Sequence, residues 1–192
     1  VNGTSTIQLN SSAPKSKLSA DSTMISQACR NCEDWTEKDI IYIVGQVKDQ
    51  AVQSLCMVYG CDYCASNDLY ETIKSRVSTG LLDIPNIEWA ETTELGRINA
   101  VDPLRITSLR VRGMWFIEHP LKVFDYVYQR DVDRTFNLMA IINNQKIAEL
   151  GNFDRLESIA AENPNLRIAD IQIKNPNNPA DLINAKLIKF SR

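Results

Sequence analysis

The sequence contains a single histidine, His119, and it lacks a complete catalytic motif. The nucleophile motif G-x-S-x-G, the metal motif H-E-x-x-H, the P-loop and the dinucleotide motif G-x-G-x-x-G are all absent. One histidine excludes any site built from two or more. Its position before Pro120, at the start of an expected helix, favours a surface or capping role over that of a catalytic base. The sequence therefore predicts that the chain is not an enzyme.

Long hydrophobic runs and an excess of positive charge are also missing. The longest apolar stretches, such as IIYIVG at 40–45, are far shorter than the roughly 20 residues that a membrane span needs. Lys and Arg number 21 against 24 Asp and Glu, which gives a net charge of −3. Because binding to phosphates needs clustered basic side chains, we predict that the chain does not bind nucleic acid.

The first half of the chain is expected to be helical. Residues 1–28 are rich in Ser, Thr and Asn and predict a flexible N-terminal arm. Residues 29–80 form a Cys-containing region in which apolar residues recur at helical spacings, first over 36–59 and then from Ser66 to Gly80. This pattern predicts a helical hairpin. Residues 81–104 are interpreted as a connection, because Pro85 biases its neighbour away from helix.

The second half, residues 105–192, shows a regular succession of strand-like and helix-like patterns. Its order is β-α-β-β-α-β followed by an extra strand, which is the arrangement of a ferredoxin-like αβ sandwich. Two α-β-β units in tandem describe the same order equally well. Either description gives an α+β fold with helices on one face of a mainly antiparallel sheet. The expected strands are 105–116, 134–144, 145–151, 166–173 and 185–190, and the expected helices are 120–130 and 153–165.

The stretch KIAELGNFDRLESIAAENPNLRIADIQI (146–173), followed by AKLIKFS (185–191), resembles a known family. Its succession of strand, Gly, aromatic residue, amphipathic helix, strand, loop and last strand is similar to the C-terminal unit of PilO/GspM-type assembly proteins. These belong to type IV pilus and type II secretion systems. The resemblance covers about residues 105–192. It implies a periplasmic ferredoxin-like domain that forms dimers and hetero-oligomers and has no enzymatic activity.

Five cysteines stand in the two segments ACRNC and CMVYGCDYC, namely Cys29, Cys32, Cys56, Cys61 and Cys64. In an oxidising compartment such clustered thiols form structural disulfides, and all five are disulfide candidates, with one left over or paired between chains. Cys29, Cys32, Cys61 and Cys64 also have the C-x2-C…C-x2-C spacing of a zinc site. A continuous helix over 36–59 would separate the two pairs by about 36 Å. Free thiols in a reducing compartment are a further alternative, and no cofactor other than zinc is expected.

Arg110 and Arg112 are two positions apart in an expected strand, so their side chains point to the same face of the sheet. This basic stripe is either a solvated strand face or a docking surface for an acidic partner, and the two arginines are the candidate partner-binding residues.

Together these observations lead to one main hypothesis and one alternative. The main hypothesis is a non-enzymatic, periplasmic or secreted assembly protein that binds other protein subunits of a bacterial pilus or secretion machine as a homo- or hetero-oligomer. The alternative is a cytoplasmic zinc-binding interaction module that uses the two C-x2-C pairs.

Overall fold

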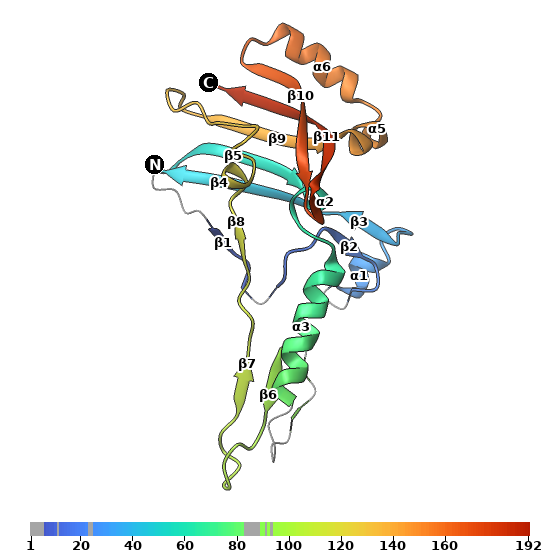
Figure 1. Cartoon of the computed structure of the whole chain (residues 1–192), viewed down its shortest axis with the longest axis vertical. Helices are drawn as coiled ribbons and strands as arrows, with labels where there is room; N and C mark the ends of the chain where they lie inside the picture. The colour runs from blue at the N-terminus through green and yellow to red at the C-terminus, as the bar shows by residue number, and fades with distance from the viewer. Residues whose placement is uncertain (1–5, 11, 23–24, 83–88, 91, 93) are drawn as a thin grey trace. The chain divides into compact units, whose positions relative to one another are not determined.

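The computed structural model describes residues 6–10, 12–22, 25–82, 89–90, 92 and 94–192. The chain forms two compact units, each made from two separate stretches (Figure 1). The ribbon unit comprises residues 1–14 and 65–117, and the sheet unit comprises residues 15–64 and 118–192. The fold is α+β with a sheet at its core, as the sequence predicts at this coarse level.

The sheet unit is built on five strands in the order β10-β11-β9-β5-β4. Neighbouring strands are antiparallel except β5 and β9, which run parallel. A parallel pair needs a long crossover connection, and the stretch between β5 and β9 contains residues 65–117 of the ribbon unit. The strands are β4 (Ile41–Lys48), β5 (Ala51–Tyr59), β9 (Asn137–Asn143), β10 (Leu166–Asn175) and β11 (Asn178–Ser191).

Shorter elements complete the sheet unit. Two short strands, β2 (Lys17–Ser19) and β3 (Glu37–Asp39), pair with each other. The helices are α1 (Gln27–Arg30), α2 (Gly60–Tyr63), α4 (Pro120–Val123), α5 (Asn144–Leu150) and α6 (Phe153–Glu162).

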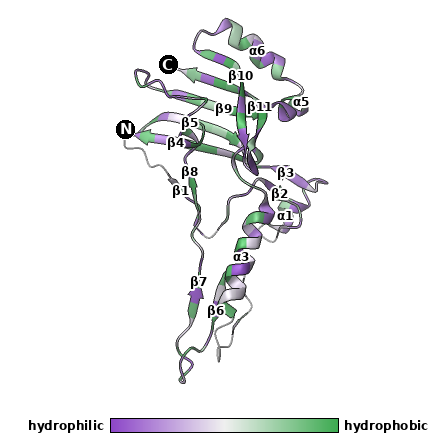
Figure 2. Ribbon diagram, viewed as in Figure 1, coloured by the Kyte–Doolittle hydropathy of each residue, from purple (hydrophilic) through white to green (hydrophobic). Residues whose placement is uncertain are grey.

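The two faces of the sheet are covered differently, and the strands carry both hydrophobic and hydrophilic residues, as the colours of Figure 2 show. On the face covered by α5 and α6, buried Ala140 and Ile188 pack with Phe153. On the opposite face, Cys56 and Met139 are paired across the parallel strands and are fully buried. Helix α4 contacts β5, so we call this opposite face the α4 face. Burying both faces supplies most of the hydrophobic stabilisation of this unit.

The helix expected over residues 36–59 is wrong, and with it the helical hairpin. The segment forms the antiparallel hairpin β4–β5, joined by Asp49 and Gln50, which both have positive φ. Two consecutive left-handed residues make the tight turn that matches strand twist. The apolar residues here are mostly Ile and Val, which favour strands, and their spacing fits either period. The helix predicted to follow is confirmed as α3 (Asn67–Leu82).

The C-terminal prediction is correct in part. The strands expected around 134–144, 166–173 and 185–190 are confirmed as β9, β10 and β11, and the helix after Gly151 is confirmed as α6. The strand expected over 145–151 is wrong, because Asn143 caps a helix there: its side-chain oxygen accepts a hydrogen bond from Lys146 N at 2.8 Å. With α5 in that place and β5 parallel to β9, the ferredoxin-like arrangement is not confirmed.

Two expected elements near residue 115 are shorter than predicted. The strand expected over 105–116 is limited to β7 (Leu109–Val111), with a separate strand β8 (Phe116–Glu118) after it. The helix expected over 120–130 is limited to α4. His119 is the N-cap of α4, where Nδ1 accepts a hydrogen bond from Leu121 N at 3.1 Å, so the capping interpretation is confirmed.

The ribbon unit combines α3 with short paired strands. Strand β6 (Gly96–Ile98) pairs with β7, and β1 (Thr6–Gln8) pairs with β8. Tyr70 on α3 contacts Trp115 edge to face, with ring centroids 5.7 Å apart. None of the helices in the described part of the chain is long and apolar enough to cross a membrane.

Gly60 gives a direct test of the packing in the sheet unit. A Cβ added there would lie 2.5 Å from Ser16 O and 2.7 Å from Lys15 O, both main-chain atoms. We expect Gly60→Ala to lower the free energy of unfolding by about 1–3 kcal/mol. Gly80→Ala on α3 is the control, since an added Cβ meets nothing within 4 Å and Ala is better in a helix by about 0.5–1 kcal/mol. Urea unfolding measures both, and a Gly60→Ala variant as stable as the wild type would contradict the close approach.

Candidate functional site

The pair of strands β6 and β7 places arginines opposite one another. In their antiparallel register Arg97 faces Arg110, while Gly96 faces Val111 and Ile98 faces Leu109. Opposing residues share a face, so Arg97 and Arg110 project from one side of the ribbon and buried Ile98 from the other. We call residues 94–112 the arginine ribbon.

The inner side of the arginine ribbon is fixed by contacts within the ribbon unit. Trp89 forms a β-bridge with Ile98, and a Cβ at Gly96 would lie 2.6 Å from the Trp89 ring, so only glycine fits there without movement. Ala90 N donates to Arg97 O at 2.9 Å. The Ser78 hydroxyl on α3 donates to Leu95 O. One side of the ribbon is thus packed, and the arginine side is left outward.

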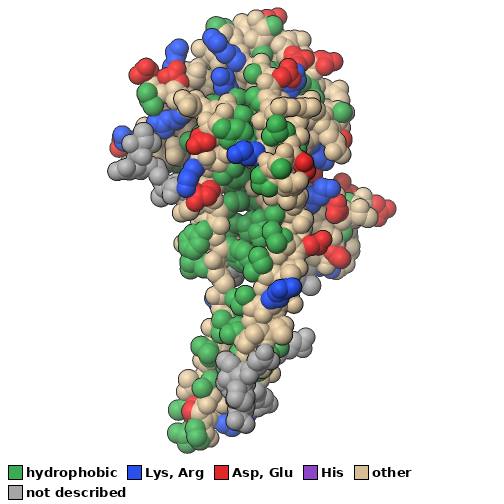
Figure 3. Space-filling view, viewed as in Figure 1, with side chains coloured by type: hydrophobic (Ala, Val, Ile, Leu, Met, Phe, Trp, Pro, Cys, Tyr) green, Lys and Arg blue, Asp and Glu red, His purple; other side chains and the backbone are tan. Residues whose placement is uncertain are grey.

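The loop that joins β6 to β7 is ordered by Asp102. Its carboxylate accepts hydrogen bonds from Leu104 N at 3.0 Å and from Thr107 N at 2.7 Å. The hydrogen bonding from Thr107 lowers the pKa of Asp102 from its ordinary value. In the same loop Leu104 and Ile106 are 78% and 80% exposed, and Figure 3 shows hydrophobic side chains at this end of the ribbon.

The positive charges of the ribbon outnumber the carboxylates available to them. Glu94, whose side chain is 15% exposed, pairs with Arg110 Nε at 3.2 Å and with Arg112 Nε at 2.6 Å. Arg97 Nε donates to the neutral amide oxygen of Asn99 at 3.1 Å. Like charges directly opposite each other in an antiparallel pair are destabilising, and here one carboxylate is shared by two guanidinium groups. Arg97, Arg110 and Arg112 together therefore carry more positive charge than the one carboxylate of Glu94 balances.

This arrangement suits an extended anionic partner. Each guanidinium has five N–H donors in a planar fork, and most of them are unused by the contacts above. Such forks bind phosphate and carboxylate groups through two parallel hydrogen bonds. Arg110 and Arg112 were expected to share a face, and the structure places both beside Glu94 on one side of the ribbon. Arg97 was missed, because it joins the set only through strand pairing and not through spacing in the sequence.

The five cysteines do not come together. All have free thiols in the structure: Cys29 and Cys32 are exposed near α1, Cys56 and Cys64 are buried, and Cys61 is half-buried. No group of three or more His, Cys, Asp or Glu in the described residues is arranged to hold a metal ion, so the four cysteines of the zinc alternative form no such group.

The cysteines near the end of β5 lie in a poorly solvated environment. Burial raises the pKa of Cys56 to about 12 and that of Cys61 to about 11. Burial also raises the pKa of Asp62, which accepts a hydrogen bond from Asn143 Nδ2 at 2.8 Å. A raised thiol pKa means a small fraction of reactive thiolate. These groups are suited to packing and hydrogen bonding and not to nucleophilic catalysis.

Comparisons with known proteins give a consistent result. A family model described as NgoPII restriction endonuclease matches residues 1–174. The type II restriction enzyme NgoPII of Neisseria gonorrhoeae is 54% identical over 187 residues, which cover 97% of this chain. The chain spans 66% of that protein, slightly less than two thirds of its length. The comparison with solved structures finds no match.

These matches overturn several predictions from the sequence. The similarity to PilO/GspM-type proteins is wrong, because it depended on a strand–helix–strand spacing that many αβ proteins share. A restriction endonuclease is an enzyme that acts on DNA. The predictions of a non-enzymatic pilus or secretion subunit, of a zinc module and of no nucleic-acid partner are therefore wrong.

The periplasmic or secreted location is also wrong, because it depended on the pilus and secretion assignment that these matches overturn. The disulfides were expected from an oxidising compartment and lose that support, although their pairing stays a prediction.

Thiol labelling tests the placement of the cysteines. At pH 8 a thiol reagent should modify exposed Cys29 and Cys32 first. The labelling rates of Cys56 and Cys61 should be lower by a factor of about 100 or more, because burial suppresses both access and thiolate formation. Mass spectrometry after timed labelling gives the rates, and labelling in 8 M urea without reductant is the control. Cys56 reacting as fast as Cys29 in the native protein would contradict the structure, and thiols that stay unlabelled in urea would reveal disulfides.

Proposed function

The chain belongs to the NgoPII restriction endonuclease family, and we propose that it binds duplex DNA as the substrate of a type II restriction endonuclease. We further propose that the arginine ribbon is one of its DNA contacts. The observation that carries this assignment is the pairing of Arg97 with Arg110 across two strands, with Arg112 on the same face and Glu94 shared between two guanidinium groups.

The dimensions of the arginine ribbon fit a groove of DNA. The major groove is about 12 Å wide and admits a two-stranded β-ribbon. Phosphates flank the groove with one negative charge per about 1.7 Å of helix axis. Guanidinium groups on one face of a ribbon can contact phosphates or the O6 and N7 acceptors of guanine. An anion between Arg97 and Arg110 would relieve the repulsion that the free ribbon contains.

The overall acidity of the chain does not conflict with DNA binding. The net charge is −3, yet residues 94–112 contain four arginines and two acidic residues. One of those acidic residues, Asp102, accepts hydrogen bonds from the main chain of its own loop. Affinity for DNA depends on the cations that contact phosphates, and exposed charges farther away than about 10 Å are largely screened at 0.1 M salt. A local positive surface is therefore sufficient for an acidic protein to bind DNA.

Cleavage of the phosphodiester bond needs different groups from those that bind the substrate. Enzymes that hydrolyse phosphodiesters commonly use divalent metal ions held by carboxylates. Among the residues that the structure describes, no three potential metal ligands are grouped to hold an ion. The ribbon geometry supports a role in binding the substrate. In the cytoplasm, where this substrate lies, reducing conditions would keep the cysteines as free thiols.

Substitution of the ribbon arginines tests the proposal. Arg97→Gln and Arg110→Gln should each weaken binding to duplex DNA by about 1–3 kcal/mol, because each removes a guanidinium from the contact surface. Where the lost contact is to a phosphate, the slope of log K against log salt should also fall by about 1. Fluorescence anisotropy with a labelled duplex at several salt concentrations measures both quantities.

The control is Arg76→Gln, which removes an exposed arginine from α3 in the same unit and should leave affinity and slope near the wild-type values. Equal affinities of Arg97→Gln, Arg110→Gln and Arg76→Gln would show that the ribbon does not contact DNA. A wild-type chain that bound no duplex at any salt concentration would refute DNA binding itself.

A further inference from the structure

A second pair of like charges lies on the α4 face of the sheet unit. Arg167 on β10 is directly opposite Lys189 on β11, and Lys189 is in turn opposite buried Met139 on β9. Neither cation forms an ion pair with a carboxylate in the described part of the chain. Directly opposed residues have Cβ atoms about 4.5–5.5 Å apart, so the two positive charges repel each other without compensation.

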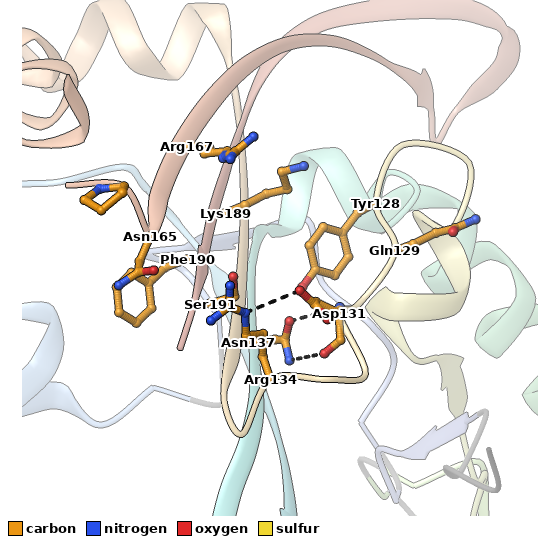
Figure 4. Close-up of a pocket in the computed structure, with 11 residues that line it drawn as sticks. Tyr128, Gln129, Asp131, Arg134, Asn137, Asn165, Arg167, Lys189, Phe190 and Ser191 are labelled. Atoms are coloured by element: carbon orange, nitrogen blue, oxygen red, sulfur yellow. Dashed lines mark hydrogen bonds and ion pairs between the residues drawn. The ribbon is translucent and has the colours of Figure 1, made fainter. Parts of the chain in front are cut away.

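The two cations line a polar cavity of about 320 Å³ (Figure 4). Its size is at the lower end of the range of roughly 300–1,000 Å³ for small-molecule sites. In Figure 4, Arg167 and Lys189 lie together at one side, while Asp131, Arg134 and Ser191 lie at the other. The lining side chains come from β10 and the loop before it, from β11, and from β9 and the segment before it, so the pocket belongs entirely to the sheet unit.

The wall opposite Arg167 and Lys189 is held in place by Asn137. Its buried amide donates to Asp131 O at 2.9 Å and accepts from Asp131 N at 3.1 Å. Asp131, the one carboxylate in the lining, pairs with Arg134 at 3.6 Å and accepts from Asp133 N at 3.0 Å. This carboxylate is therefore engaged on its own side of the pocket and does not neutralise the pair across from it.

Neutral donors complete the lining. Ser191 uses its main-chain N–H to donate to Asn165 O, and its hydroxyl has no partner among the described residues. The hydroxyl of buried Tyr128 also has no partner among the described residues. Burial raises the pKa of Tyr128 to about 12, so this hydroxyl remains protonated near neutral pH. Three cations and two hydroxyls face a pocket that has a single, engaged carboxylate.

We propose that this pocket binds a phosphate group, through Arg167 and Lys189 with the Ser191 and Tyr128 hydroxyls as further donors. In the DNA complex the group is a phosphodiester of the DNA backbone, a statement that rests on the proposed function. Guanidinium and ammonium groups are the usual partners of phosphate oxygens, and a bound dianion or phosphodiester would remove the repulsion between the opposed cations. The pocket is thus a backbone contact that contributes affinity without reading sequence.

The double variant Arg167→Gln/Lys189→Gln tests the pocket in two assays. Arg76→Gln/Arg155→Gln is the matched control, because it removes two exposed arginines from α3 and α6, where no ion pair with a described residue is lost. In the first assay, thermal unfolding is followed with increasing inorganic phosphate against chloride at equal ionic strength. Phosphate at about ten times its Kd should raise the unfolding midpoint by about 3–6 °C in the wild type and the control. The pocket variant should show no such rise.

In the second assay, binding to duplex DNA is measured at several salt concentrations. The slope of log K against log salt should fall by about 1 in the pocket variant and stay unchanged in the control. An equal phosphate response in all three proteins would overturn the proposal. A phosphate response lost only in the pocket variant, with an unchanged DNA slope, would overturn the assignment to the DNA backbone and leave free phosphate as the ligand. If the wild type binds no DNA, the proposed function fails, and the phosphate assay alone decides whether the pocket binds anions.

Discussion

The parallel pairing of β5 with β9 is the constraint on which the sheet unit depends. It joins the hairpin β4–β5 to the three later strands, and the two paired segments are separated in sequence by the whole of residues 65–117. Cys56 and Met139 are paired at its centre and fully buried. At one end, Asn143 accepts from Lys146 N to start α5 and donates to Asp62, so one side chain joins a strand end, a helix start and the segment after β5. Because the two strands are far apart in the sequence, bringing them together costs conformational entropy of the chain between them. Burial of the core that the pairing completes offsets this cost.

The other end of the same sheet is polar. Ser191, Asn137 and Ser54 follow one another across β11, β9 and β5. Ser54 donates to Gln46, which also accepts from Arg130. Asn137, beside Ser54 in this row, bonds instead to the main chain of Asp131 and so holds one wall of the phosphate pocket. Both proposed DNA contacts, in the two units, contain opposed cations whose repulsion is retained in the folded protein. Residues that destabilise a free protein are retained where a ligand compensates them.

The sequence allowed prediction of the elements whose side-chain pattern is unambiguous. Strands β10 and β11 alternate clearly, and α6 has one apolar stripe that ends before Pro164, so both types were predicted correctly. The hairpin β4–β5 was not, since its Ile and Val residues fit both periods and no Gly or Asn marks the turn at Asp49 and Gln50. Part of the candidate site was predictable, because Arg110 and Arg112 share a face by spacing alone. Arg97, and the pair of Arg167 with Lys189, depend on strand register, which a single sequence does not reveal. The sequence contains none of the general catalytic motifs that would have indicated an enzyme. Its net charge of −3 gave no sign of the two local groups of cations.

The central claim is that DNA binds to the arginine ribbon and to the pocket between β10, β11 and the segment before β9. Hydrogen–deuterium exchange followed by mass spectrometry, with and without a duplex at low salt, tests both surfaces in one measurement. We predict slower exchange on DNA binding in residues 96–112, 129–135 and 164–167, while α6, on the opposite face of the sheet, keeps its exchange rates. Slower exchange confined to α5, α6 and the strand ends beneath them, with none in those three segments, would contradict the account.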